Sequence, residues 1–156
     1  MRRRVSALLA LTLLVVTTCR AEALTLRDML GRDVTVATAP VRIVSLVPSV
    51  TEVMFALGAQ DRLVGRTDYC DYPPAAASRP SVGGMINPSL ERIVSLKPDL
   101  VVATDEGNRE ETIQQLRRVG LPVYLVHATR VSEMLQMIER VGEVTGRQAA
   151  VPALVA

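Results

Sequence analysis

Short apolar runs alternate with amphipathic stretches along most of the chain. Four of these runs have the length of buried strands, at residues 42–47, 62–67, 100–104 and 122–126. Between and after them, apolar residues recur at intervals of three and four, which indicates helices with one buried face. Two such faces consist of Val50, Val53, Met54 and Leu57, and of Val131, Met134, Leu135, Ile138 and Val141. Strands that alternate with helices predict an α/β fold with a central parallel sheet flanked by helices on both faces.

Turn and capping residues indicate where the first elements begin and end. Residues 25–28 and 33–36 read as a short hairpin, with Gly31 available for its turn. Ser49 and Glu52 have the spacing of a capping box, in which each side chain accepts a hydrogen bond from the backbone of the other. The first helix is therefore expected to begin at this serine.

Two further helices are bounded by proline and glycine. Pro88 suits the first turn of a helix that ends before Pro98. This helix is expected to turn three apolar side chains inward, those of Leu90, Ile93 and Val94. A polar helix over residues 109–119 would end at Gly120.

The first 23 residues have the pattern of an export signal. Arginines at positions 2–4 precede an almost uninterrupted apolar stretch from Val5 to Val16, shorter than the ~20 residues of a membrane span. The A-x-A arrangement at residues 21–23 predicts cleavage after Ala23. Lipoprotein processing at Cys19 and a retained membrane anchor are the alternatives. We therefore expect an exported protein.

Removal of this signal changes the charge and the cysteine count. The formal net charge is +2, and residues 1–23 hold four arginines and one glutamate, so the remainder carries −1. This balance gives no reason to expect a nucleic-acid partner. One histidine and two cysteines are too few for most structural zinc sites. Cys70, the cysteine that remains, is expected to be buried and structural.

The loops that follow the strands are the places where a parallel sheet binds its ligands. Tyr69 and Tyr72 in one such loop offer flat faces to a large planar ligand, or else fold back onto their own strand. The sequence contains no phosphate-binding loop, dinucleotide fingerprint or nucleophile elbow. His127 follows a strand without a paired nucleophile, so we do not expect an enzyme. An exported α/β enzyme that uses Asp105 or His127 is the alternative.

Several segments resemble one known family. They are RIVSLVPSVTE at residues 42–52, FALG at 55–58, TDYCDYP at 67–73 and NPSLERIVSLKPDLV at 87–101. Over about residues 25–150 the chain resembles helical-backbone (class III) periplasmic binding proteins of ABC importers, and the last two segments are most similar to the cobalamin-binding branch. The resemblance implies a Rossmann-like lobe, a periplasmic location and delivery of a bound metal chelate to a membrane permease. The chelate would be cobalamin, or alternatively a ferric siderophore or haem.

The resemblance also implies which residues carry the function. Ligand contacts would come from the loops at the strand ends, at Pro48, Ser49, Tyr69, Gly84, Met85, Gly107 and Asn108. Glu91 matches an acidic residue that docks a lobe onto arginines of the permease. The metal would belong to the ligand, since neither a resident cofactor nor a catalytic residue is implied. Some cobalamin binders place a tryptophan near the position of Met85; this sequence has no tryptophan, which leaves the exact chelate open.

The length departs most from the family pattern. Members have two similar lobes joined by a long helix, so residues 24–146 are interpreted as the N-terminal lobe and 147–156 as the start of the interlobe helix. Pro152 would interrupt that helix. The sequence then represents either a fragment of a longer protein or a lobe that pairs with another chain. A single lobe buries less of a ligand, so weak binding is expected.

Overall fold

The strands form one parallel sheet that is preceded by a hairpin. In the computed structural model, which describes residues 23–156, the sheet has the order β4-β3-β5-β6. Its strands span Leu63–Arg66, Ile43–Ser45, Leu100–Thr104 and Val123–Val126 in that order, and neighbouring strands are parallel. β1 (Leu24–Arg27) and β2 (Asp33–Val36) form the predicted antiparallel hairpin. The predicted export signal and Cys19 lie outside the described residues.

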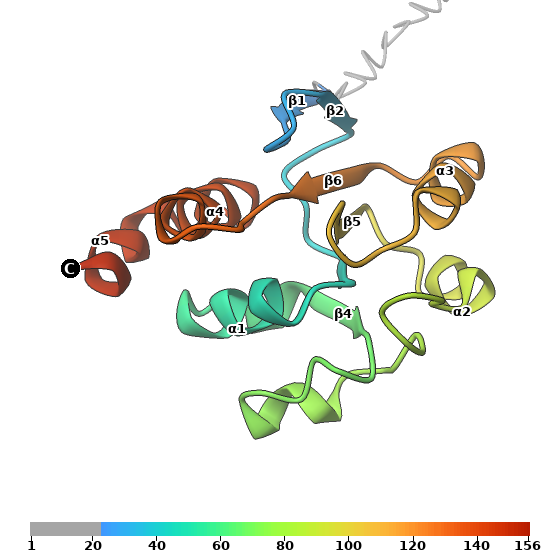
Figure 1. The fold of residues 1–156 in the computed structure, drawn as a ribbon, viewed down its shortest axis with the longest axis horizontal. Coiled ribbons are helices and arrows are strands. Elements are labelled where there is room, and N and C mark those ends of the chain that lie inside the picture. The colour runs from blue at the N-terminus through green and yellow to red at the C-terminus, as the bar shows by residue number, and fades with distance from the viewer. Residues whose placement is uncertain (1–22) are drawn as a thin grey trace, which may run out of the picture.

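Helices cover both faces of the sheet, as the alternating pattern predicts (Figure 1). The helices on one face are α1 (Pro48–Ala56) and α4 (Val131–Val144), and those on the other are α2 (Leu90–Ser95) and α3 (Glu110–Arg118). Short connections contain the 3₁₀ segments η1 (Gln60–Arg62), η2 (Pro74–Ser78) and η3 (Gln148–Ala150), and the chain ends in α5 (Val151–Val155). Within residues 23–156, no helix has the length and apolar character needed to cross a membrane.

Successive residues of the strands pack into two separate hydrophobic cores, one on each face of the sheet. Ile43, Leu100 and Val102 pack with α1 and α4, whereas Val44 and Val101 pack with α2 and α3. This division follows from the alternation of side chains along a strand. Because both faces are covered, the strands are apolar throughout, as is typical of parallel sheets.

The hairpin is attached to the edge strand β6. The hydroxyl of Tyr124 donates a hydrogen bond to the carbonyl oxygen of Arg27 at 3.0 Å, and the N–H of Met29 donates to the carbonyl oxygen of Leu125 at 3.0 Å. Val34 and Val36 of the hairpin are buried in the same core as α1 and α4. The hairpin therefore closes one end of that core.

Three expectations about helix starts and faces are wrong. α2 has Ser89 as its N-cap, which accepts from the Arg92 N–H, so Pro88 lies before the helix and pairs with Gly83 in a short bridge. Val94 is 44% exposed, because the inward contact of this short helix is made by Ile93. The predicted capping box of α1 is not formed: Pro48 occupies the first turn, and no side chain caps this helix. Proline has no N–H to satisfy and its φ suits the first position, so the helix begins one residue earlier than Ser49.

The apolar face expected for α4 is only partly buried. Val141 is buried, but Val131, Met134 and Leu135 are 75%, 48% and 42% exposed. The helix contacts the core through Met137, Val141 and Val144, a face rotated from the predicted one.

The end of the chain turns before it becomes helical again. Gly146, with φ of +62°, follows α4, and Pro152 lies in the first turn of α5, where proline is tolerated. Pro152 thus lies in the first turn of a short helix and does not interrupt one. That residues 147–156 begin an interlobe helix stays a prediction.

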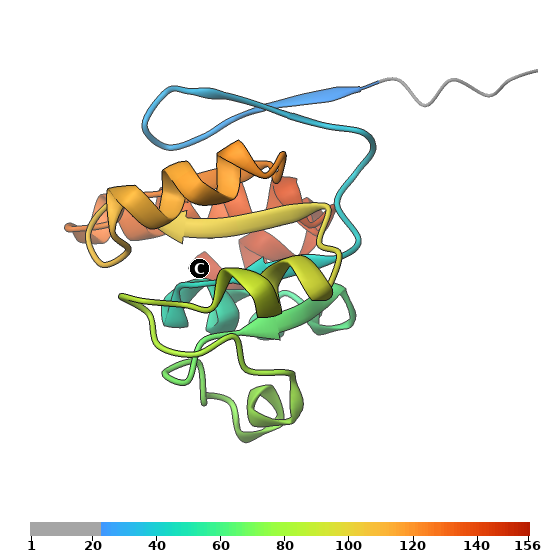
Figure 2. The same ribbon diagram turned by 90° about the vertical axis from the view of Figure 1, so that its right-hand side faces the viewer.

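All strands of the parallel sheet end at the same edge of the molecule. In Figure 2 this edge lies on the left, where the arrowhead of β5 points and where the loops after the strands gather. The order of the strands reverses between β3 and β5, since β4 follows β3 on one side and β5 adds on the other. In such a sheet the crevice at this switch point is the expected ligand site.

Candidate ligand-binding groove

An open groove lies at this switch point, above the carboxyl ends of β3, β5 and β6. Its volume is about 420 Å³, within the range of small-molecule sites. The lining residues are Val47, Pro48, Ser49, Glu52, Met85, Thr104, Glu106, Val126, Ala128 and Met137. Of the seven predicted ligand contacts, Pro48, Ser49 and Met85 therefore line one groove.

The β3–α1 connection forms one wall. β3 ends at Ser45, whose hydroxyl donates to the carbonyl oxygen of Val47 at 2.9 Å and so turns the chain into the helix. Ser49, in the first turn of α1, donates to the thioether sulfur of Met137 at 3.8 Å. This contact joins α1 to α4 across the groove floor and orients the hydroxyl away from the capping role that the sequence suggested.

The loop at residues 83–88 forms the opposite wall through Met85. Gly84, its neighbour, has open space around the position that a Cβ would occupy. A ligand can approach the backbone closely at such a residue. Gly84 does not itself line the groove.

Gly107 and Asn108 lie behind this wall. Asn108 is 6% exposed; its Oδ1 accepts from the Thr104 N–H at 2.8 Å and its Nδ2 donates to the carbonyl oxygen of Met85 at 2.7 Å. The amide is thus buried and engaged within the protein, and a ligand contact at Asn108 stays a prediction. Gly107 lies directly under the Met85 side chain.

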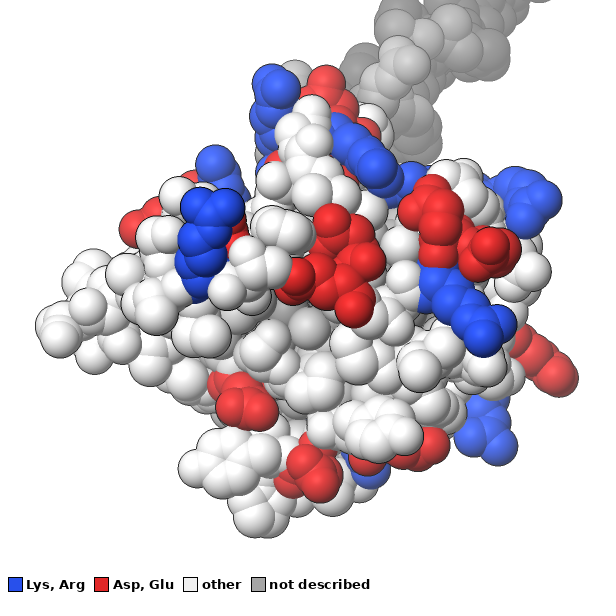
Figure 3. Space-filling view, in the orientation of Figure 1, with Lys and Arg blue, Asp and Glu red and all other residues white. Residues whose placement is uncertain are grey.

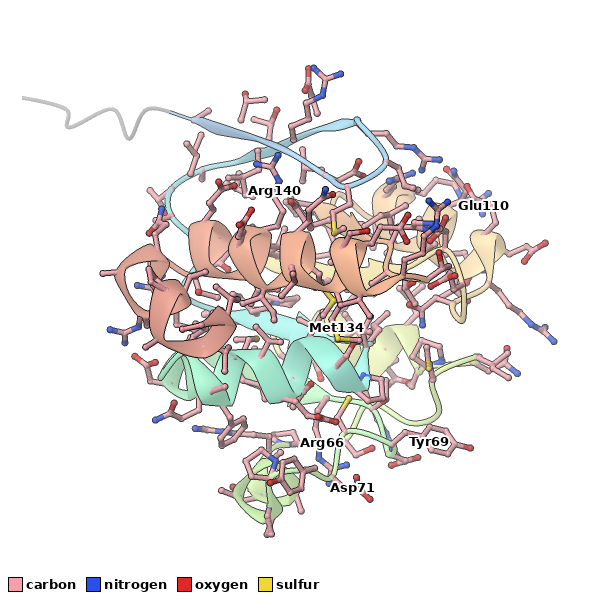
Figure 4. All side chains as sticks on the ribbon, turned by 60° about the vertical axis from the view of Figure 1, so that its left-hand side comes forward. Arg66, Tyr69, Asp71, Glu110, Met134 and Arg140 are labelled. Carbon is pink, nitrogen blue, oxygen red and sulfur yellow. The ribbon has the colours of Figure 1, made fainter. Side chains whose placement is uncertain are left out.

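Tyr69 lies outside the groove, on the loop after β4. Its side chain is 65% exposed and Figure 4 shows it pointing away from the body of the protein. Arg66 organises this region by donating to the carbonyl oxygens of Thr67, Ala76 and Ala77. Tyr72 is 64% exposed, so neither ring folds onto its own strand.

Cys70 is buried in the same loop. It is 1% exposed, with its sulfur 3.2 Å from the hydroxyl oxygen of Thr67. The predicted burial of this cysteine is confirmed.

Acidic side chains define the electrostatics of the groove. Glu52 and Glu106 line it, and none of its lining residues is Lys or Arg. Figure 3, which views this edge of the sheet, shows acidic atoms gathered near the centre of the face, with basic and further acidic side chains around its periphery. The groove thus suits neutral or cationic ligands better than anionic ones.

His127 joins the loops that follow β5 and β6. Its Nδ1 lies 3.1 Å from Asp105 Oδ1, and its Nε2 lies 3.9 Å from Glu133 Oε2. The hydrogen bond to Asp105 is the main cause that raises the pKa of His127 above 6.5, with support from the charges of Glu106 and Glu133. His127 therefore connects the loop after β5 to the loop after β6 at the rim of the groove.

Within residues 23–156, no three His, Cys, Asp or Glu side chains are grouped so that they could hold a metal ion.

Sequence reasoning missed most of the groove floor. Four of the missed residues lie at the end of a predicted strand or within two residues of it: Thr104, Glu106, Val126 and Ala128. Their place in the sequence could therefore have indicated that they line the groove. No sequence pattern indicated Met137, because the predicted buried face of α4 did not include it.

Glu91 lies away from the groove, in the first turn of α2. The side chain is exposed to solvent. An exposed carboxylate in this position is free to make an intermolecular charge-assisted hydrogen bond.

Comparison with known proteins identifies the family. A family described as periplasmic binding protein matches residues 43–156. The chain belongs to this family. The match covers the whole parallel sheet and the groove residues, and it confirms the resemblance seen in the sequence.

Two relatives illustrate the similarity in sequence. The vitamin B12-binding protein of Photorhabdus laumondii is 37% identical over 105 residues, which cover 67% of this chain and 38% of that protein. An uncharacterized ABC transporter substrate-binding lipoprotein of Bacillus subtilis is 39% identical over 134 residues, which cover 84% of this chain and 42% of that protein. The chain thus spans about two fifths of the length of these relatives.

Solved structures show the same fold. The periplasmic vitamin B12-binding protein of Vibrio cholerae matches with a TM-score of 0.68 and 31% identity, over 74% of this chain and 45% of that one. A periplasmic haem-binding protein of Pseudomonas aeruginosa matches with a TM-score of 0.69 and 28% identity, over 73% and 41%. The fold is therefore shared between proteins named for different ligands.

Proposed function

We propose that this chain is the N-terminal lobe of the substrate-binding component of an ABC importer, and that it captures cobalamin or a related corrinoid in the periplasm. The observation that carries the proposal is a groove without basic residues at the carboxyl edge of the sheet. Two of the compared proteins are named for vitamin B12 binding, which supports the ligand class.

The charge of the groove distinguishes between the candidate chelates. Cyanocobalamin carries no net charge, whereas haem carries two propionates and catecholate siderophores are anionic with their ferric ion. Glu52 and Glu106 repel anionic groups, and the lining residues offer no cation to pair with them. A corrinoid therefore meets the smaller electrostatic penalty.

The residues of the walls suit a large, mostly apolar macrocycle. Pro48 and Ala128 give apolar surface, and the thioethers of Met85 and Met137 adapt to an irregular face. The Ser49 hydroxyl and the backbone at Gly84 supply polar contacts for side-chain amides of a corrin ring. Tyr69 lies outside the groove and is 65% exposed, so it would contact only a ligand that extends well beyond the groove.

Haem, or a ferric siderophore, is the second candidate. Haem is favoured by the similarity to a solved haem-binding protein. In that case the propionates would have to lie toward solvent or toward a second lobe. The proposed ligand is cargo for transport, and the proposal includes no catalytic step.

The test is a competition between chelates. The purified protein is titrated by calorimetry with cyanocobalamin, hemin and ferric enterobactin at equal ionic strength. We expect cyanocobalamin to bind most tightly. Tighter binding of hemin would transfer the assignment to haem, and binding of ferric enterobactin alone would transfer it to siderophores.

The proposed partner is the membrane permease of the importer. Glu91 is the proposed docking residue, because its carboxylate is exposed on α2 and outside the groove. Export through residues 1–23 would bring the protein to the compartment that the permease faces, and a lipid anchor at Cys19 would in addition hold it at the membrane. Glu91→Lys should leave cyanocobalamin binding unchanged and reduce delivery to vesicles that carry the permease. Unchanged delivery would reject the docking role.

A further inference from the structure

The loop between Gly83 and Pro88 is fixed at its base. Gly83 and Pro88 form a bridge, and the Ser89 N–H donates to the carbonyl oxygen of Val82 at 2.7 Å. The N–H of Asp68 donates to the carbonyl oxygen of Gly83 at 2.8 Å. These bonds fix the base of the loop. They do not fix Met85 at its tip, whose position depends on other contacts.

Asn108 holds the tip from the neighbouring loop. Its Nδ2 donates to the carbonyl oxygen of Met85 at 2.7 Å, and its Oδ1 accepts from the N–H of Thr104 at 2.8 Å. The side chain is 6% exposed, so water competes little for either bond. One amide thus connects the end of β5 to the tip of a loop 23 residues away in the sequence.

Gly107 supplies the surface on which the Met85 side chain rests. A Cβ at position 107 would collide with the terminal methyl group of Met85 and would lie 3.3 Å from its sulfur. The φ angle of Gly107 is not in the left-handed region, so the backbone does not require glycine here. An added Cβ would instead displace the end of the Met85 side chain.

We propose that Gly107 and Asn108 are positioning residues that hold Met85 on the wall of the groove and thereby determine the affinity for the macrocycle. This inference rests on the proposed function for its ligand. It assigns Asn108 a role different from direct contact. The hydrogen bond fixes the backbone of the tip, and the glycine leaves room for the thioether.

Two variants separate these roles. Asn108→Ala removes both hydrogen bonds and should release the tip, so we expect faster amide exchange over residues 84–87 and about fivefold weaker binding of cyanocobalamin. Gly107→Ala keeps both bonds and displaces only the thioether. Its affinity should fall by a similar factor while amide exchange of the tip stays nearly unchanged. Thermal melting checks that each variant is folded.

Ile86→Ala is the matched control. Ile86 lies in the same loop, but its side chain is 55% exposed and does not line the groove. We expect neither exchange nor affinity to change. Met85→Ala provides the second comparison: because Gly107 acts through Met85, the double variant Gly107→Ala/Met85→Ala should bind no more weakly than Met85→Ala alone.

The experiment is hydrogen exchange by mass spectrometry on each variant, followed by titration with cyanocobalamin. Unchanged exchange in Asn108→Ala would overturn the proposal, as would additive losses of affinity in the double variant. If the unmodified protein binds no cyanocobalamin while Asn108→Ala still frees the tip, the corrinoid assignment fails and the positioning role of Asn108 stands.

Discussion

The imidazole of His127 lies 3.1 Å from the carboxylate of Asp105, so that the loops after β5 and β6 are joined at the rim of the groove. Glu133 of α4 lies on the other side of the ring at 3.9 Å. Carboxylates on both sides favour the protonated imidazole and raise its pKa above 6.5. The connection between the two loops should therefore depend on pH.

The pH dependence has a definite sign. Since the native state binds the proton more tightly than the unfolded chain, His127 stabilises the fold fully below pH 6.5, and this contribution is lost as the pH rises through the native pKa. The chain has one histidine, so its imidazole resonances are unambiguous by NMR. Asp105→Asn should lower the measured pKa toward 6.5. A pKa that is unchanged in this variant would show that the hydrogen bond is not its cause.

The burial of Tyr124 predicts a second change in stability, at alkaline pH. Burial raises its pKa to about 12, so the folded protein keeps the phenol neutral where the unfolded chain ionises at 10.0. Stability should therefore fall between these values as the pH rises. Absorbance titration of the three tyrosines should show one that ionises only near pH 12.

Tyr124→Phe is the variant that checks this assignment. It should remove the late ionisation and cost about 1 kcal/mol at neutral pH, because the hydrogen bond to Arg27 is lost. Persistence of the late step in Tyr124→Phe would assign it to another tyrosine.

Met137 is expected to support both the core and the groove. It is 1% exposed, and Met137→Ala should lower the free energy of unfolding by about 2–4 kcal/mol. Met134, 48% exposed on the same helix, is the matched control, and its replacement by alanine should change stability by less than about 0.5 kcal/mol. Urea denaturation measures both. Equal effects would mean that α4 packs on a different face.

Charge reversal in the groove should change the preference for ligands. Glu52→Lys with Glu106→Lys replaces two negative charges by positive ones, and we expect the affinity for hemin relative to cyanocobalamin to rise about tenfold. Glu139→Lys is the control, because Glu139 lies on α4 outside the groove. A similar change in the control would attribute the effect to net charge alone.

The alternation of apolar runs was sufficient to predict the architecture. The four strands, the hairpin and the glycines after the helices follow from local rules, and Gly58 and Gly120 do have positive φ. Local rules failed where two signals competed: at the start of α1, Pro48 displaced Ser49 from the cap position. They also failed for α4, where tertiary packing selected the face with Met137.

The site was predicted in part for the same reason. Pro48, Ser49 and Met85 follow strands or lie in glycine-containing loops, and the topology brings them together. The burial of Asn108 depends on the approach of a loop 23 residues away, which no local pattern reveals. The contact roles of Tyr69, Gly84, Gly107 and Asn108 stay predictions.

Methionine-methyl NMR tests the corrinoid proposal most directly, because it detects even weak binding and localises it. Met85 and Met137 line the groove, whereas Met54 is fully buried in the core and does not. On titration of the labelled protein with cyanocobalamin, we predict saturable shifts of the first two methyl resonances, an unshifted Met54 and weaker binding of hemin. No shift of Met85 and Met137 at millimolar cyanocobalamin, or a tighter response to hemin, would contradict the proposal that this groove binds a corrinoid.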